Sequence, residues 1–192
     1  LGIEHCLNME ERVLSTEKIY DGVIINVEKE KVALPDGHES YREIVRHSGA
    51  VAVLAITNDN KVILVKQWRS PIAKTTLEIP AGKLDDRDEG NALHAVNREL
   101  NEEIRLKATQ LKKVTGFYSS VGFSDEYMTL YVAKDLKPVS DELPRDPGED
   151  LKVKAYSLDE LKALMATGQI EDAKTVMAIW YFELMQLKQA QD

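Results

Sequence analysis

The chain has 192 residues, of which 33 are acidic and 25 basic, a formal net charge of -8 and a single cysteine. This length suits one domain with a sizeable core, or one domain with a small dimerising extension. The negative charge argues against a broad surface for nucleic acid or an anionic membrane, and the lone Cys6 excludes an intramolecular disulfide and a cysteine-built zinc site.

The first part of the chain predicts a meander of strands. Residue types that favour strands alternate with short turns that contain glycine. We expect the strands at residues 13–20, 23–31 and 41–47. We assign residues 9–47 to this meander and 48–192 to the main domain. Residues 1–8 stand outside this scheme, as a tag or an upstream extension.

The remaining chain predicts further strands and two C-terminal helices. The Asn58-Asp59-Asn60 turn between two valine- and isoleucine-rich runs predicts a hairpin. Ser157 and Glu160 have the spacing of a capping box, and the residues from Asp141 to Asp150, with two prolines and a glycine, predict an exposed loop. We expect strands at 50–56, 61–67, 111–117, 127–133 and 152–156, and a last helix over 173–189. Strands that enclose helices predict an α+β protein or α/β/α layers.

The sequence also predicts where the protein resides. It has no apolar run of membrane-spanning length, and its N-terminus lacks the basic and hydrophobic regions of a secretory signal. A single cysteine suits a reducing compartment. We therefore expect a cytoplasmic protein that does not bind membranes.

Three carboxylates, Glu99, Glu102 and Glu103, follow Arg98 on a predicted helix. Residues three and four apart share a helical face, where like charges repel by roughly 0.2 to 0.5 kcal/mol per pair. A hard cation with oxygen ligands would offset this repulsion, and Mg²⁺ suits a few carboxylates together with water and phosphate oxygens. The alternative is an acidic, solvated helix face that needs no metal.

The order of the surrounding residues favours the metal. The chain reads Glu78-Ile-Pro-Ala-Gly82, an acidic loop with Glu89, then Arg98-Glu99-Leu100, one residue, and Glu102-Glu103. This order resembles the signature of the Nudix hydrolases. It departs twice: two extra residues lie between Gly82 and Arg98, which puts the role of Glu89 in doubt, and Arg105 stands where a glycine is usual.

Other segments resemble one branch of that family, the bacterial ADP-ribose pyrophosphatases. These segments are residues 42–47, 49–53, 67–69, 78–83 and 122–126. The resemblance implies the Nudix fold, a mixed sheet sandwiched between helices, and a homodimer formed through the N-terminal strands. It also implies Mg²⁺-dependent hydrolysis of ADP-ribose, a small nucleoside diphosphate derivative, to AMP and ribose 5-phosphate, with Mn²⁺ as a substitute metal.

Alternative functions remain open at this point. Many ADP-ribose hydrolases have a proline at the position where this chain has Val121, so a sugar nucleotide such as ADP-glucose or GDP-mannose is the second candidate substrate. A different class of answer is a non-catalytic Nudix module that senses a nucleotide. Such modules can lose the acidic residues of the signature, and this chain retains them.

The resemblance also implies roles for single residues. Glu99 and Glu103 are the first choices as metal ligands, with Glu102 in the same cluster and the carbonyl of Ala81 as a backbone ligand. Arg98 orients these carboxylates or contacts phosphate. Bound metal would polarise the phosphoryl oxygens and position water.

The general base and the substrate contacts come from other segments. Glu126 matches the position of the base, and Asp125 is its rival. Guanidinium groups match phosphate and ribose oxygens, so Arg42 and Arg69 are candidate substrate contacts, with a surface salt bridge as the alternative for each. Tyr20 for adenine stacking and Glu78 for ribose or metal-bound water complete the predicted set.

Overall fold

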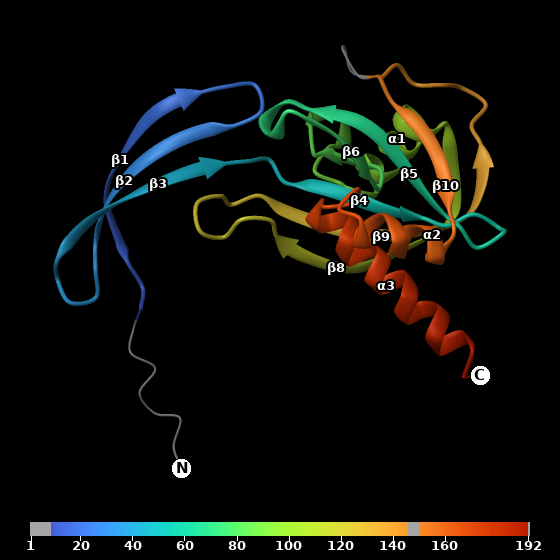
Figure 1. Ribbon diagram of the computed structural model, residues 1–192. Coiled ribbons are helices and arrows are strands. Elements are labelled where there is room, and N and C mark those ends of the chain that lie inside the picture. Colours follow the sequence, from blue (N-terminus) through green and yellow to red (C-terminus); the bar gives the residue numbers. More distant parts are fainter. Residues whose placement is uncertain (1–8, 146–149, 192) are drawn as a thin grey trace. The chain divides into compact units, whose positions relative to one another are not determined.

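Figure 1 shows the computed structural model, which describes residues 9–145 and 150–191. The chain forms two units. The strand unit consists of the described residues up to Gly49 together with Tyr118–Tyr127, and the core unit consists of Ala50–Phe117 and the described residues from Met128 onward. The residues assigned to a tag, 1–8, and Pro147 and Gly148 of the predicted loop lie outside the described residues.

The strand unit contains the predicted N-terminal meander. Its strands β1 (Arg12–Asp21), β2 (Asn26–Ala33) and β3 (Glu39–Arg46) pair antiparallel in the order β1-β2-β3. All ten residues of β1, an edge strand, are exposed. The segment Tyr118–Tyr127 adds a parallel bridge from Ser124 to Val45 at the end of β3.

The core unit contains two sheets. The larger has the order β7-β4-β9-β8, in which β4 (Ala50–Ala55) pairs parallel with β9 (Tyr127–Pro138) and antiparallel with β7 (Ala81–Lys83). Its other edge strand is β8 (Leu106–Tyr118). The smaller sheet, in the order β10-β5-β6, is antiparallel throughout. It consists of β5 (Val62–Arg69), β6 (Lys74–Glu78) and β10 (Lys152–Tyr156).

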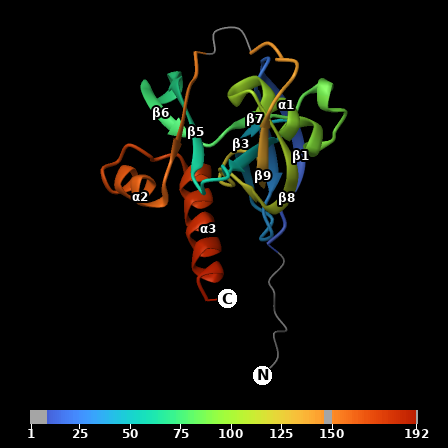
Figure 2. The same ribbon diagram turned by 90° about the vertical axis from the view of Figure 1, so that its right-hand side faces the viewer.

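Helices cover both faces of the larger sheet. Alternate residues of a strand point to opposite faces, and every residue of β4 is buried, as expected for a central strand with helices on both sides. Val51 and Val53 belong to the core cluster that includes α1 (Ala92–Ile104), whereas Ala52 and Leu54 belong to the cluster that includes α2 (Leu158–Ala166) and α3 (Ala173–Gln189). Figure 2 shows α1 and the pair α2 and α3 on opposite sides. The predicted α/β/α layering is therefore confirmed.

Two local predictions differ from the structure. The predicted turn forms, and Asn60 adopts a left-handed conformation in it, with φ of 58°. The hairpin prediction is wrong, because the two strands on either side of the turn share only one bridge, between Ile56 and Val62. The two strands then separate into different sheets, because each finds its partners elsewhere. Four short elements have no counterpart in the prediction, because short elements leave little periodicity in the sequence. They are the strands β6 and β7 and the 3-10 helices η1 (Ser70–Ile72) and η2 (Asp86–Asp88).

The C-terminal helices follow the prediction closely. The Ser157 side chain accepts a hydrogen bond from the Glu160 amide, and the Glu160 carboxylate accepts one from the Ser157 amide at 2.8 Å. This reciprocal pair is the predicted capping box. The final helix covers 173–189, as predicted. Within the described residues, no helix is long and apolar enough to cross a membrane.

Candidate active site

Helix α1 places the three predicted carboxylates beside the core. Asn91 caps the helix by accepting a hydrogen bond from the Leu93 amide at 3.0 Å. Glu99, Glu102 and Glu103 are only 7%, 4% and 2% exposed. The acidic face is therefore buried, and the alternative of a solvated face is wrong.

Arg98 lies among these acids and holds several of them at once. Its Nη1 donates to Glu99 Oε1 at 2.5 Å and to Glu102 Oε2 at 2.9 Å. Its Nε and Nη2 donate to the two carboxylate oxygens of Asp88 at 3.0 and 2.9 Å, and Nη2 also donates to the Lys83 carbonyl at 3.0 Å. Burial opposes the charge of Arg98, but these partners raise its pKa above the ordinary value. This geometry fits the predicted orienting role.

Asp88, which binds Arg98, is a site residue that the sequence analysis does not predict. It is 1% exposed, in η2, and burial would raise its pKa, but the hydrogen bonds from Arg98 keep that pKa below the ordinary value. Glu89, the acid considered instead, is exposed in a left-handed conformation. A signal was present, because five residues separate Gly82 from Asp88, the spacing that the signature requires of its first acid. The extra residues therefore lie after this position, with an aspartate in place of the glutamate.

The loop before α1 adds a second guanidinium group. Arg87 donates to Asp85 and also contacts Glu102, with 3.1 Å between Nη1 and Oε1. The hydrogen bond from Arg87 lowers the pKa of Asp85 to about 2. We name the α1 cluster for the five acids and two arginines in this region: Asp85, Arg87, Asp88, Arg98, Glu99, Glu102 and Glu103.

The strand β7 approaches these acids closely. The Ala81 amide donates to Glu103 Oε2 at 3.1 Å. A Cβ atom added to Gly82 would lie 1.8 Å from Oε1 of Glu99 and 2.1 Å from its Cδ. Only glycine therefore leaves room for the Glu99 carboxylate against the backbone.

The donor set of this region fits a hard divalent cation. Glu99, Glu102 and Glu103 offer buried carboxylate oxygens, and the missing side chain of Gly82 provides a cradle beside one of them. Within the described residues, no three acidic, histidine or cysteine side chains converge as a preformed metal cluster. Arg98 Nη1 bridges two of these carboxylates, those of Glu99 and Glu102.

A second charged group lies where β6 meets α3. Glu78 is 2% exposed and accepts two hydrogen bonds from Arg69, at 2.7 Å from Nε and 2.6 Å from Nη2. It also accepts hydrogen bonds from Thr76 and from Lys174. Lys174 contacts Asp172 at 3.0 Å as well. Burial would raise the pKa of Glu78, but these donors lower it to about 2. We call Arg69, Glu78, Asp172 and Lys174 the Glu78 cluster.

The strand unit holds the predicted base and its rival. Asp125 accepts a hydrogen bond from the His47 amide at 2.8 Å and contacts Arg46 Nη1 at 3.4 Å, so its carboxylate ties the loop to the end of β3. Glu126 accepts a hydrogen bond from the Ser119 hydroxyl and lies 3.8 Å from His47 Nδ1. Both carboxylates therefore have partners within the strand unit, and Glu126 stays the predicted base with Asp125 as its rival.

The other two predicted substrate residues also belong to the strand unit. Arg42 forms a salt bridge with Glu11 and donates to Ser40 Oγ and to the Tyr41 carbonyl, which matches the alternative of a surface salt bridge. Tyr20 is 57% exposed on β1, and its ring lies over the following turn. The predicted site residues are divided between the two units. Seven of them lie in the core unit: Ala81, Glu78, Arg69, Arg98, Glu99, Glu102 and Glu103. The other three, Tyr20, Arg42 and Glu126, lie in the strand unit.

Arg105, which replaces the usual glycine, ends α1 in a left-handed conformation, with φ of 61° and ψ of 30°. Its amide donates to Asn101 and Leu100 carbonyls, and its side chain donates to the Asn101 carbonyl at 3.2 Å and to the Leu143 carbonyl. These contacts compensate for the strain of a non-glycine residue at this position.

Comparisons with known proteins show the family of this chain. The model of the NUDIX domain matches residues 46–179. The chain is 41% identical over 184 residues to "ADP-ribose pyrophosphatase" of Bacillus subtilis, with 96% of this chain and 98% of the relative covered. It is 40% identical over 177 residues to "Methanol dehydrogenase activator" of Bacillus methanolicus, with coverages of 92% and 95%. A solved structure described as an ADP compounds hydrolase has a TM-score of 0.79 at 22% identity, with coverages of 94% and 96%.

The chain belongs to the NUDIX domain family, and the solved structure confirms the predicted fold. Nudix hydrolases generally need divalent metal ions, in agreement with the predicted use of a metal.

Proposed function

We propose that this protein hydrolyses the pyrophosphate bond of ADP-ribose to AMP and ribose 5-phosphate, in a reaction that requires Mg²⁺ and accepts Mn²⁺. The observation that carries the proposal is the α1 cluster, in which three glutamates are buried on one helix and two of them, Glu103 and Glu99, lie against the Ala81 and Gly82 backbone. The near full-length similarity to an ADP-ribose pyrophosphatase supports the substrate.

The core-unit residues divide the work between metal and substrate. Glu99, Glu102 and Glu103 hold the metal, with the Ala81 carbonyl as a backbone ligand, and Arg98 orients the carboxylates. The bound metal supplies polarisation of the phosphoryl oxygens and stabilisation of the leaving phosphate. Arg69 and Glu78 bind the substrate. From the strand unit, Tyr20 and Arg42 contribute adenine stacking and an anion contact.

Glu126 acts as the general base toward the attacking water. Removing a positioned base costs about 10²- to 10⁴-fold in rate. We expect Glu126→Gln to lower kcat by at least about 100-fold with little change in the half-saturating Mg²⁺ concentration, as measured by steady-state kinetics. Asp125→Asn is the matched control, because it removes the neighbouring carboxylate. A larger loss in the control than in Glu126→Gln would assign the base to Asp125.

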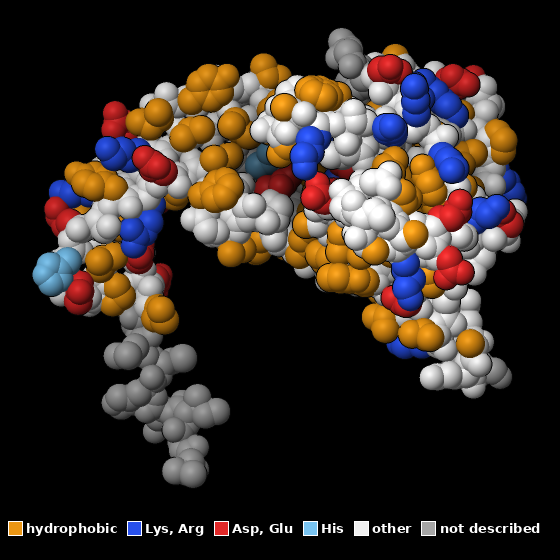
Figure 3. All heavy atoms as spheres, in the orientation of Figure 1, with side chains coloured by type: hydrophobic (Ala, Val, Ile, Leu, Met, Phe, Trp, Pro, Cys, Tyr) orange, Lys and Arg blue, Asp and Glu red, His pale blue; other side chains and the backbone are white. Residues whose placement is uncertain are grey.

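The protein is proposed to work in the cytoplasm as a homodimer formed through its N-terminal part, residues 9–47, with residues 48–192 as the catalytic domain. Figure 3 shows hydrophobic side chains over the strand unit. The exposed hydrophobic residues of the strand unit include Val13, Leu14, Ile19, Tyr20 and Tyr41. An exposed edge strand with apolar side chains favours pairing with a second copy. We propose no role in binding nucleic acid or membranes.

A second candidate function is activation of a dehydrogenase. The similarity to the Bacillus methanolicus activator is nearly the same, in identity and coverage, as that to the pyrophosphatase. This candidate requires that the protein raise the activity of a purified methanol dehydrogenase. A sugar nucleotide such as ADP-glucose or GDP-mannose is the alternative substrate for the hydrolysis itself, and a non-catalytic nucleotide sensor is the remaining alternative.

The test is chromatographic detection of AMP from ADP-ribose, with and without Mg²⁺, beside ADP-glucose and GDP-mannose. Mg²⁺-dependent AMP release that is fastest from ADP-ribose and lost in Glu103→Gln supports the proposal. Faster cleavage of a sugar nucleotide would retain the chemistry and replace the substrate. Nucleotide binding without any product would favour the sensor. A separate assay measures the rate of a purified methanol dehydrogenase. Stimulation of that rate by the Glu103→Gln protein would separate activation from hydrolysis.

A further inference from the structure

Lys174 is a buried charged residue that no sequence motif marks. It is 8% exposed at the second position of α3, and it contacts the carboxylates of Glu78 and Asp172. A buried lysine is costly unless its charge is paired and hydrogen-bonded. Among the hydrogen bonds and ion pairs of the described residues, Lys174 pairs with Glu78 and Asp172 and with no member of the α1 cluster, so Glu78 is its link to a ligand.

Glu78 connects Lys174 to Arg69. The Glu78 carboxylate receives the Nε and Nη2 edge of Arg69, and Lys174 donates to the oxygen that also receives Nη2. Within the described part of the chain, Nη1 of Arg69 makes no hydrogen bond, and the side chain is 41% exposed. One edge of the guanidinium is therefore fixed, and the other faces outward as a donor for an anion.

The charges of the Glu78 cluster explain why Lys174 matters. Arg69 and Lys174 balance Glu78 and Asp172, so the cluster is neutral as a whole. Without Lys174, the two carboxylates would face only Arg69. Their excess negative charge would draw the guanidinium inward and weaken its attraction for a phosphate. The negative charges of Glu103 and Asp172 already act on Arg69.

We propose that Lys174 is a positioning residue that, through Glu78, holds Arg69 as an anchor for the pyrophosphate of the substrate. This inference rests on the proposed function for the identity of the substrate. It assigns Lys174 to substrate affinity and not to the chemical step, because Arg69 would bind the ground state and the transition state equally.

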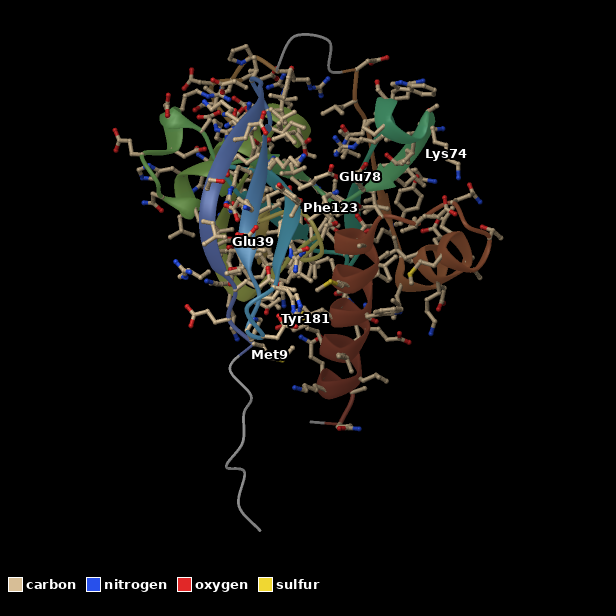
Figure 4. The ribbon with its side chains drawn as sticks, turned by 90° about the vertical axis from the view of Figure 1, so that its left-hand side faces the viewer. Met9, Glu39, Lys74, Glu78, Phe123 and Tyr181 are labelled. Atoms are coloured by element: carbon tan, nitrogen blue, oxygen red, sulfur yellow. The ribbon has the colours of Figure 1, made fainter. Side chains whose placement is uncertain are left out.

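Lys74 provides a matched control. It also links β6 to the segment before α3, through a 3.1 Å ion pair with Glu171, but its side chain is 60% exposed. Figure 4 shows Lys74 at the rim of the view and Glu78 nearer its centre. Exposed ion pairs contribute little. Lys74→Met therefore removes a lysine from the same junction without touching the Glu78 cluster.

The experiment measures KM and kcat for ADP-ribose and, by calorimetry without metal, the Kd for inorganic pyrophosphate. For Lys174→Met, we expect KM and Kd to rise about tenfold, as for the loss of a charged hydrogen bond, with kcat within about twofold. Lys174→Arg should restore both values, and Lys74→Met should match the wild type. Unchanged KM and Kd in Lys174→Met, or a loss confined to kcat, would overturn the inference.

A double-mutant cycle tests whether Lys174 acts through Arg69. In an Arg69→Gln background, Lys174→Met should raise the pyrophosphate Kd by less than about twofold, because the group that it positions is gone. A full tenfold increase in that background would overturn the inference. If Lys174→Met does not fold, Lys174→Gln replaces it, since glutamine removes the charge and retains a hydrogen-bond donor, and it should raise Kd by about two- to threefold.

Failure of the proposed function can be distinguished from failure of the inference about Lys174. If the wild type does not cleave ADP-ribose, the substrate proposal falls, and the pyrophosphate Kd values still decide the role of Lys174. If the wild type cleaves ADP-ribose and Lys174→Met is unaffected, the function stands and the inference falls.

Discussion

The two charged clusters of the core unit differ in their balance. The α1 cluster contains five carboxylates and two guanidinium groups, whereas the Glu78 cluster contains two groups of each sign. An excess of buried carboxylates favours a cation, and a neutral cluster that leaves one guanidinium edge outward favours an anion. The two clusters therefore differ in the sign of the ligand that their charge balance favours, more than in the number of their charges.

The largest expected effect comes from closing the approach of β7 to the α1 cluster. Gly82→Ala would place a Cβ atom 1.8 Å from the Glu99 carboxylate, so either the carboxylate or the strand must move. A displacement of about 1 Å in a catalytic group can lower the rate by about 100-fold. We expect a fall in kcat of that size and a higher half-saturating Mg²⁺ concentration. Gly122→Ala is the control, because its added Cβ would meet nothing within 4 Å.

A second test changes only the Glu78 cluster. The pKa of Glu78 is lowered to about 2 from 4.5, so its stabilising contribution is complete above about pH 4.5 and is lost as the pH falls toward 2. Glu78→Gln leaves Arg69 and Lys174 without their carboxylate and should cost about 3 to 5 kcal/mol of unfolding free energy at pH 7.

Denaturant unfolding at several pH values measures this contribution. The difference between wild type and Glu78→Gln should shrink as the pH is lowered from about 4.5 toward 2. A difference that stays constant over this range would mean that the Glu78 charge is not what stabilises the cluster. Lys74→Met, which removes an exposed pair, should stay near the wild type at every pH.

A third test adjusts the balance of the α1 cluster. Arg87 contacts Glu102 at 3.1 Å and is 49% exposed, so it reduces the negative charge of the cluster only in part. We expect Arg87→Gln to lower the half-saturating Mg²⁺ concentration by about threefold, because a cation that competes with the metal is removed. Lys162→Gln, which breaks an exposed pair with Glu183, should have no such effect. Weaker metal binding in Arg87→Gln would show that Arg87 organises the carboxylates.

The contrast between the clusters also explains how much the sequence could predict. Three members of the α1 cluster, Glu99, Glu102 and Glu103, lie on one helix, so the spacing alone placed them on one face. The other acids of the cluster precede that helix. The fold class and most elements followed from period and turn residues in the same way. The Asp88 contact was within reach, since its spacing from Gly82 fits the signature.

The Glu78 cluster could not be found from spacing. Lys174 is nearly one hundred residues from Glu78, and only the packing of α3 against β6 brings them together. The hairpin error has the same origin, because the partners of β4 and β5 are distant strands that no local pattern reveals. Local spacing thus predicted the acidic face of α1, whereas the Glu78 cluster depends on tertiary packing.

The smallest expected effect concerns the end of the helix that carries the α1 cluster. Arg105 adopts a left-handed conformation that favours glycine. Arg105→Gly and Arg105→Ala both remove the side-chain contacts to the Asn101 and Leu143 carbonyls, so these two variants differ only in backbone strain. We expect the alanine variant to be less stable than the glycine variant by about 1 kcal/mol in denaturant unfolding. Equal stabilities would mean that the helix end relaxes, and the α1 cluster would then depend on its side-chain contacts rather than on a fixed helix terminus.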